Sequence, residues 1–123
     1  MNAWTGEELE RVAAAEELEL TAAGRAVTIW VVRLGDDVYV RSVRGRTSGW
    51  FHRVLERHEG SISAGGVTKD VTFVEVDDDQ VNDAVGEAYR EKYGGRYPDD
   101  FIDPLLTPEA RAATLRLVPR RRP

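Results

Sequence analysis

The segment from Val38 to Trp50 combines the residue types that proteins use to bind anions. A hydroxyl group and two glycines lie among three arginines, and an aromatic residue follows: Arg41, Ser42, Arg44, Gly45, Arg46, Gly49 and Trp50. Guanidinium groups and the backbone N–H groups of a helix start together bind phosphate or carboxylate. We therefore predict an anion site here, with Trp30 and Trp50 as flat apolar walls. The alternative is that the arginines are solvated and that Trp50 and Phe51 belong to the core.

The rest of the sequence offers no complete catalytic or metal-binding motif. It contains no cysteine, which excludes thiol nucleophiles and cysteine-ligated metals. His52 and His58 would fall on different faces of a helix, and the run Asp77–Asp79 lacks the glycine and the glutamate of a calcium loop. No serine lies in a nucleophile elbow. We predict no metal site and assign no catalytic side chain; an enzyme of this kind would use a cofactor for the chemistry.

Length and composition predict a single, mildly acidic domain. The chain has 123 residues, 41% of them hydrophobic, and 17 Lys+Arg against 22 Asp+Glu, for a net charge of −5. A domain of this size buries a substantial core without disulfides. The negative charge argues against a nucleic-acid partner. The total nevertheless hides a basic range, 41–58, and an acidic range, 70–103.

The sequence predicts neither a membrane span nor export. Its longest wholly apolar run, Ile29–Val32, is far shorter than the roughly 20 residues that cross a bilayer. The first residues lack the basic start and the apolar stretch of a secretory signal. We therefore expect a cytoplasmic protein with no membrane partner.

The N-terminal half predicts one helix and three strands. Thr5 and Glu8 match a capping box, and Trp4 and Leu9 match the hydrophobic staple around it. Residues 1–17 are therefore expected to form an N-terminal helical segment. Strand patterns follow at 18–21, 26–34 and 38–43.

The C-terminal half predicts two longer helices, a hairpin and a final strand. The expected elements are a helix at 50–57, strands at 61–64 and 67–76, a helix at 77–93, a short helix after Thr107 and Pro108, and a strand at 114–118. Residues 94–106 are expected to be irregular, and Tyr93, Tyr97 and Phe101 either line a pocket or anchor this loop to the core. Residues 120–123 are expected to be a frayed basic tail. Six strands joined mostly by hairpins predict an α+β, mainly β, antiparallel fold in one domain, 1–123.

Several short strings, in their order along the chain, resemble the deazaflavin-dependent nitroreductase family. They are Leu20-Thr21, Gly24-Arg25, Ile29-Trp30-Val31-Val32-Arg33, Tyr39-Val40-Arg41-Ser42, Trp50-Phe51-His52, the Gly65-Gly66 hairpin and the strand 115–119. Within the same superfamily, which includes the pyridoxamine 5′-phosphate oxidases, the sequence is similar to a bacterial family of uncharacterised proteins. The resemblance covers about residues 18–119. It implies the FMN-binding split-barrel fold, a six-stranded antiparallel split β-barrel with flanking helices.

The resemblance also implies a function and a set of site residues. Such proteins bind FMN or a deazaflavin, which passes hydride to a small molecule, and they hold the cofactor's phosphate with a hydroxyl and basic groups. Nitroreductase relatives carry a longer turn, rich in Gly, Lys, Arg and Ser, before the second strand, and only Gly24 and Arg25 remain of it here. The cofactor-binding residues predicted by position and by the aromatic walls are Arg25, Thr28, Trp30, Ser42, Arg44, Gly45 and Trp50.

Two other readings remain open beside a flavin- or deazaflavin-dependent oxidoreductase. One is a split-barrel binding protein without redox activity, which would hold a planar anion. The other is a structural dimer whose basic segment meets the acidic helix of its partner. The resemblance implies a homodimer with cofactor sites at the subunit interface in any case.

Overall fold

The chain folds around one curled antiparallel sheet. The structure is a computed structural model that describes residues 3–120. In chain order its elements are α1 (Gly6–Ala14), β1 (Leu18–Ala22), β2 (Arg25–Ile29), β3 (Val32–Leu34), β4 (Asp37–Arg41), the 3₁₀ turn η1 (Gly45–Thr47), α2 (Gly49–Arg57), β5 (Glu59–Ala64), β6 (Val67–Glu75), α3 (Asp79–Tyr93), α4 (Asp99–Ile102), the 3₁₀ turn η2 (Asp103–Leu106), α5 (Pro108–Arg111) and β7 (Thr114–Pro119).

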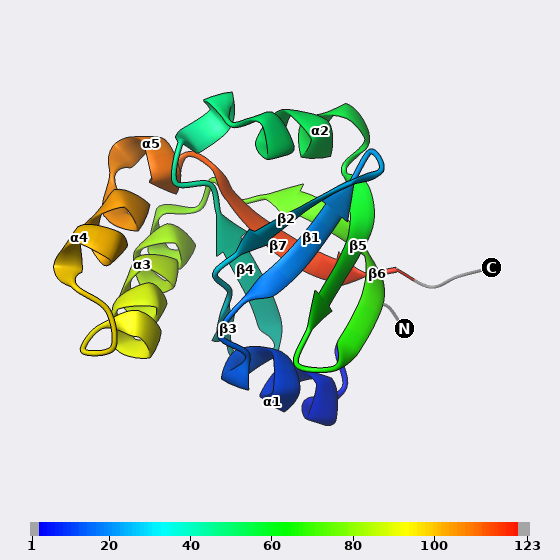
Figure 1. Ribbon diagram of the computed structural model, residues 1–123, viewed down its shortest axis with the longest axis horizontal. Coiled ribbons are helices and arrows are strands. Elements are labelled where there is room, and N and C mark those ends of the chain that lie inside the picture. The colour runs from blue at the N-terminus through cyan, green and yellow to red at the C-terminus, as the bar shows by residue number, and fades with distance from the viewer. Residues whose placement is uncertain (1–2, 121–123) are drawn as a thin grey trace.

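The seven strands lie in the order β2-β1-β5-β6-β7-β4-β3, and every neighbouring pair is antiparallel. The two edge strands, β2 and β3, are consecutive in the chain and only Trp30 and Val31 separate them. Two residues span only a short distance, so the sheet curls until its edges approach each other. The result is a half-barrel whose two edges are joined by the chain itself (Figure 1).

The expectation of six strands is wrong, because residues 26–34 form two strands instead of one. Nothing in this apolar run signals a turn. The backbone at the break is satisfied from α3: the Tyr93 hydroxyl accepts the Val31 N–H at 3.1 Å, and Lys92 Nζ donates to the Val31 carbonyl at 2.7 Å. These side chains replace the hydrogen bonds that a neighbouring strand would make. The chain can therefore leave the sheet edge at β2 and continue at the other edge as β3.

Two hydrophobic clusters lie on opposite faces of β4. Val38 and Val40 belong to the cluster inside the half-barrel, and Tyr39 belongs to the cluster beneath α3. This division follows from the alternation of side chains along a strand. Figure 1 shows α1 and α2 at opposite ends of the curled sheet, with α3, α4 and α5 beside it. The second cluster joins the sheet to α3, α4 and η2.

The N-terminal signals are confirmed. Thr5 and Glu8 form the reciprocal capping box. Trp4 is buried in the inner cluster, where its indole N–H donates to the Leu117 carbonyl at 3.0 Å. This end of the chain therefore has a structural role.

The C-terminal third departs from the expectation of an irregular loop. Residues 94–106 contain α4 and η2, each of four residues. Elements this short carry no measurable periodicity, but prolines precede or open them, as prolines often do at helix starts. Beyond β7, the Arg120 N–H donates to the Asp70 carbonyl at 2.7 Å; the remainder of the expected tail, 121–123, lies outside the described residues. No helix within residues 3–120 has the length and hydropathy to cross a membrane.

Candidate functional site

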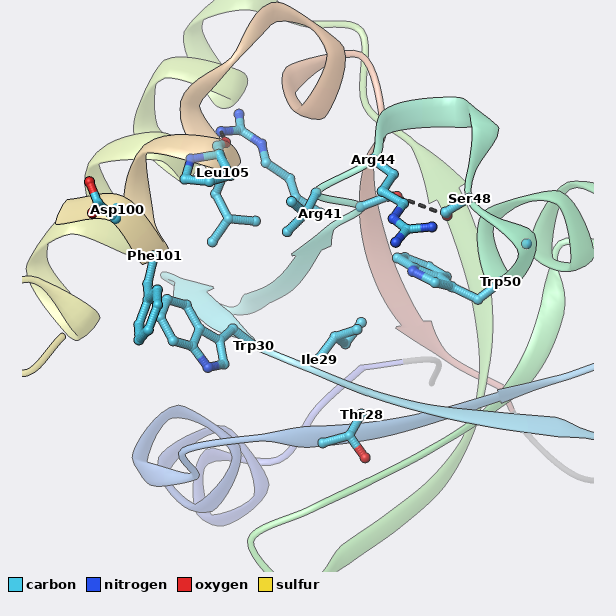
Figure 2. A pocket seen from close by; sticks show the side chains of 14 residues that line it. Thr28, Ile29, Trp30, Arg41, Arg44, Ser48, Trp50, Asp100, Phe101 and Leu105 are labelled. Carbon is cyan, nitrogen blue, oxygen red and sulfur yellow. Dashed lines mark hydrogen bonds between the residues drawn. The ribbon is translucent and has the colours of Figure 1, made fainter. Parts of the chain in front are cut away.

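A pocket of about 600 Å³ lies between β2, the loop after β4, α2 and α4. Its volume falls within the roughly 300–1,000 Å³ of small-molecule sites. Figure 2 shows two ends that differ in chemistry. The "α2 end" consists of Arg44, Ser48, Gly49 and Trp50, and the "α4 end" consists of Trp30, Asp100, Phe101 and Leu105.

A short hydrogen-bond relay builds the α2 end. The buried Ser42 hydroxyl donates to Ser48 Oγ at 2.9 Å, and Ser48 Oγ accepts the Phe51 N–H at 3.3 Å as the N-cap of α2. Asn, Asp, Ser and Thr are the residues that cap helices this way. Ser42 therefore positions Ser48, and its own proton is engaged.

The α2 end also presents unpaired positive groups. Within residues 3–120 the Arg44 side chain makes no hydrogen bond or ion pair, and the N–H groups of Gly49 and Trp50 have no acceptor. Arg46, by contrast, is bound to Glu75 at 2.5 Å and holds the pKa of that carboxyl below its usual range. Backbone N–H groups at a helix start attract anions. Arg44 is thus the guanidinium of this loop that remains available to a ligand.

Gly45 shapes the loop without lining the pocket. Its φ is +69°, and a Cβ on it would lie 2.9 Å from the Glu109 carbonyl oxygen. A side chain is therefore excluded both by backbone conformation and by contact with α5. The role of Gly45 in the structure is steric: it lets the chain turn from Arg44 into η1.

Aromatic rings dominate the α4 end. The Trp30 indole stacks on Tyr93 with centroids 3.9 Å apart and an interplanar angle of 5°, and Tyr97 packs at 4.8 Å with a tilt of 48°. Phe101 is 57% exposed at the pocket rim. Of the three aromatic residues proposed for residues 93–101, Tyr93 and Tyr97 therefore anchor the segment, and Phe101 lines the pocket.

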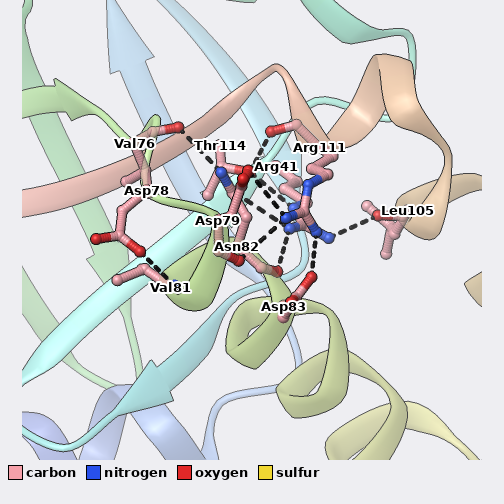
Figure 3. Close-up of polar contacts among 10 residues, drawn as sticks. All are labelled: Arg41, Val76, Asp78, Asp79, Val81, Asn82, Asp83, Leu105, Arg111 and Thr114. Carbon is pink, nitrogen blue, oxygen red and sulfur yellow. Dashed lines mark hydrogen bonds and ion pairs between the residues drawn. The ribbon is translucent and has the colours of Figure 1, made fainter.

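Arg41 ties the sheet to the helical wall of the pocket. It is 3% exposed and lies on the same face of β4 as Tyr39. Its guanidinium donates to Thr114 Oγ1 at 2.8 Å, to the Leu105 carbonyl at 3.0 Å and to the Asn82 carbonyl at 2.7 Å (Figure 3). Burial lowers the pKa of Arg41, yet an arginine remains protonated in proteins. The structure thus holds a buried cation on neutral acceptors.

The neighbouring Arg111 of α5 binds a carboxylate instead. Its guanidinium donates to the Asp83 carboxylate at 2.5 Å and to the Asp79 backbone carbonyl at 3.0 Å. This arrangement joins α5 to the start of α3 (Figure 3). The helical wall is therefore fastened at two points, one to the sheet and one to α3.

The structure brings five of the seven predicted site residues to the pocket wall, which are Thr28, Trp30, Ser42, Arg44 and Trp50. Of these, Thr28 points its hydroxyl away from the other side chains in Figure 2, because strand alternation directs Ile29 inward. Arg25 and Gly45 do not line it. Arg25 opens β2 opposite Ala22 at the far end of the hairpin.

Sequence reasoning missed several residues of the pocket, and only some of them carry a local sequence pattern that could have identified them. Ser48 precedes a helix and matches the N-cap preference, so it was available from sequence. Ile29 follows from strand alternation once β2 is placed. Asp100 and Leu105 belong to short helical turns that no periodic pattern marks, and only the fold brings them to the pocket.

Residues 3–120 contain no group of three or more His, Asp or Glu side chains placed to hold a metal ion. His58 Nε2 lies 3.7 Å from the Glu75 carboxylate, and Arg46 occupies the other side of that carboxylate.

A family match covers most of the chain. Residues 8–117 match the model of a family described as an uncharacterized protein conserved in bacteria (DUF2255), and the protein belongs to that family. No curated protein matches the chain significantly.

Three solved structures share the fold at 14% identity each. A conserved hypothetical protein from Mycobacterium tuberculosis superimposes with a TM-score of 0.65 over 98% of this chain and 83% of its own. A putative 5-nitroimidazole antibiotic resistance protein from Bacteroides thetaiotaomicron gives 0.59 over 97% and 81%. A FAD-binding protein from Mesorhizobium loti gives 0.59 over 97% and 92%. At this identity the likeness defines the α+β half-barrel and nothing finer.

Proposed function

We propose that this protein belongs to the FMN-binding split-barrel superfamily and is a flavin- or deazaflavin-dependent oxidoreductase acting on a small molecule. The observation that carries the proposal is the α2 end of the pocket. There Arg44 and the backbone N–H groups of Gly49 and Trp50, which have no partner among residues 3–120, adjoin the Trp50 ring. Two proteins with this fold, one a FAD-binding protein and one a putative 5-nitroimidazole antibiotic resistance protein, support the same class of ligand.

The residues present fit a phosphorylated flavin. Arg44 and the amides of Gly49 and Trp50 would hold the phosphate, because a charge-assisted donor and a helix start both favour a dianion. Trp30, Trp50 and Ile29 would border the ring system and exclude water. A bound flavin or deazaflavin supplies the hydride chemistry. This chain supplies binding, orientation and shielding.

A second candidate, binding without redox activity, rests on the hairpin before β2. Ala23 and Gly24 form a two-residue turn, both with positive φ, in place of the longer basic turn of nitroreductase relatives. Arg25 lies outside the pocket lining, so the phosphate gains no donor from this side. Flavin binding without reduction of a nitroaromatic acceptor would favour this candidate.

The first experiment is a visible absorbance spectrum of the purified protein, followed by fluorescence titrations with FMN and with a deazaflavin. We expect a Kd below about 100 μM for one of them, which corresponds to roughly 5 kcal/mol or more of binding free energy. Failure to bind either below that concentration would reject the oxidoreductase proposal.

Two arginine variants locate the site. Arg44→Ala should weaken flavin binding by about 1.5–3 kcal/mol, the loss of a charge-assisted hydrogen bond. Arg25→Ala removes the same charge outside the pocket and should leave the affinity unchanged. Equal effects of the two substitutions would show that long-range charge, and no contact at the α2 end, governs binding.

We also propose a homodimer with the pocket near its interface, as the resemblance implies. The pocket rim carries Val43 and Phe101, the two large apolar side chains that are at least half exposed within residues 3–120. Sedimentation equilibrium at micromolar concentration should then give twice the 13.8 kDa of one chain. A species of 13.8 kDa would contradict a stable dimer.

A further inference from the structure

We propose that the α4 end of the pocket binds an organic cation, either a protonated amine or a quaternary ammonium group. Three features carry this inference: an indole face of Trp30 that the tyrosines leave uncovered, the exposed Phe101 ring, and the Asp100 carboxylate, which has no partner within the described residues. All three residues border the same pocket, and Figure 2 shows them together at one end of it.

The packing around Trp30 leaves one face of its indole uncovered by the tyrosines. Tyr93 lies parallel to one face at 3.9 Å, Tyr97 lies at 4.8 Å, and the two tyrosine centroids are 6.1 Å apart. These distances form a nearly right-angled triangle with Trp30 at its corner. Tyr97 is therefore beside the edge of the indole, and the face opposite Tyr93 remains for the pocket.

Asp100 and Phe101 complete this end. Both lie in the first turn of α4, and Phe101 packs against Tyr97 with centroids 6.2 Å apart. Within the described part of the chain, Asp100 makes no hydrogen bond and no ion pair. Asp100 thus adds a carboxylate to the rim of this end, next to Phe101 in the chain, and no side chain of residues 3–120 pairs with it.

A cation fits this combination better than a neutral group of the same shape. The faces of aromatic rings carry negative electrostatic potential, tryptophan most strongly, and rings of this kind bind quaternary ammonium ligands. A carboxylate at the same site adds Coulomb attraction, which depends on the ligand charge and weakens with salt. Shape and apolar contact alone would bind a neutral isostere equally well.

The cation would be the substrate if the flavin proposal holds, since the phosphate would occupy the α2 end and leave the α4 end for the reacting molecule. This identification as substrate rests on the proposed function. Binding of the cation itself does not, and it is measured on the protein without added flavin.

The experiment is an NMR titration with choline and with dimethylbutanol, its neutral carbon isostere. The chain has three tryptophans, so the indole N–H signals are few, and Trp30→Phe assigns one of them. We expect millimolar choline to shift the Trp30 indole N–H signal. The signal of Trp4 should stay unchanged, because Trp4 is buried and its indole N–H donates to the Leu117 carbonyl. The isostere should bind at least about fivefold more weakly, in line with a cation–π contact.

Matched variants test the carboxylate and the ring. Asp100→Asn should lower the affinity for choline about fivefold and leave that for dimethylbutanol, whereas Asp99→Asn, one residue away and outside the pocket lining, should change neither. Phe101→Leu should lower the choline affinity more than the isostere affinity. Equal binding of the two probes, or no shift of Trp30, would overturn the cation site.

These experiments distinguish failure of the cation site from failure of the proposed flavin-dependent function. Choline binding without flavin binding would leave the cation site in place and remove its role in an oxidoreductase. Flavin binding without choline binding would be consistent with the proposed oxidoreductase function and would reject the proposed cation site.

Discussion

The hydrogen bonds that build the two ends of the pocket differ greatly in how far apart the bonded residues lie along the chain. At the α2 end, the hydrogen bond from Ser42 to Ser48 joins residues six apart, and the one from Phe51 to Ser48 joins residues three apart. At the α4 end, the bond between Val31 and Tyr93 spans 62 residues and that between Arg41 and Leu105 spans 64. The first end is a local motif, and the second depends on the completed fold.

This contrast predicts which end fails first when the structure is weakened. Local hydrogen bonds form with the loop and the helix that contain them. Long-range bonds require the sheet, α3 and η2 to be in place together. We expect loss of the long-range hydrogen bonds of Arg41 and Tyr93, which hold the α4 end in place, to reduce global stability, and loss of the local bonds at the α2 end to change mainly the site itself.

The largest expected effect belongs to Arg41→Met. The substitution keeps an apolar stem but removes the hydrogen bonds to Thr114, Leu105 and Asn82, and it leaves the Leu105 and Asn82 carbonyls without this donor. Because each unsatisfied buried group costs about 1–3 kcal/mol, we expect a loss of roughly 3 kcal/mol in the free energy of unfolding, measured with urea.

The matched control for Arg41 is Arg116→Met on the neighbouring strand β7. The Nε of Arg116 is buried without a hydrogen-bond partner, so its removal should cost under about 1 kcal/mol, as for most substitutions that break no buried network. Equal losses for the two variants would contradict the role of Arg41 as the link between sheet and helices.

Tyr93→Phe should follow in size. The ring and its stack on Trp30 are kept, while the hydroxyl that accepts the Val31 N–H and donates to the Glu16 carbonyl at 2.7 Å is lost. We expect a loss of about 2 kcal/mol in the free energy of unfolding, because the Val31 N–H is left buried and unpaired. Tyr97→Phe, which loses a hydroxyl bond to the Glu16 side chain, should cost under about 1 kcal/mol.

The same contrast explains how much the sequence could predict. The capping box of Thr5, the strand patterns and the basic loop after β4 are local, and each was predicted near its place. Ser42, Arg44 and Trp50 lie at the pocket as predicted by their positions because spacing along the chain governs them. The break at Trp30 and Val31 was missed because its hydrogen-bond partners lie on α3. Asp100 was missed as a site residue because its position depends on Arg41 holding η2.

At the α2 end, Ser48→Ala tests the local motif. Loss of an N-cap costs about 1 kcal/mol, and the buried Ser42 hydroxyl loses its acceptor. We expect a small decrease in stability together with weaker flavin binding in the fluorescence titration. Thr107→Ala removes the N-cap of α5 as the control, and it should leave flavin binding unchanged. Weakened binding in both variants would show that the effect comes from stability alone.

The smallest expected effect is a pH dependence of stability from Lys92 of α3, whose Nζ holds the Val31 carbonyl beside Trp30. Burial, assisted by the nearby Arg96, lowers the pKa of Lys92 from its ordinary 10.5 to about 8. Below pH 8 both the folded and the unfolded chain carry this proton, and the cost of burying the charge is present in full. Between about pH 8 and 10.5 the unfolded chain binds more protons, so the free energy of unfolding should rise with pH.

Tyrosines reverse this trend at higher pH. Burial raises the pKa of Tyr93 from 10.0 to about 12, so above about pH 10 the unfolded chain ionises first and stability should fall. We expect a maximum near pH 10 in the free energy of unfolding measured with urea. The rise should stay below about 1 kcal/mol, since partial solvent contact screens Lys92. Lys92→Met should lose the rise above pH 8 and keep the later fall. A rise of equal size in that variant would place the titrating group elsewhere.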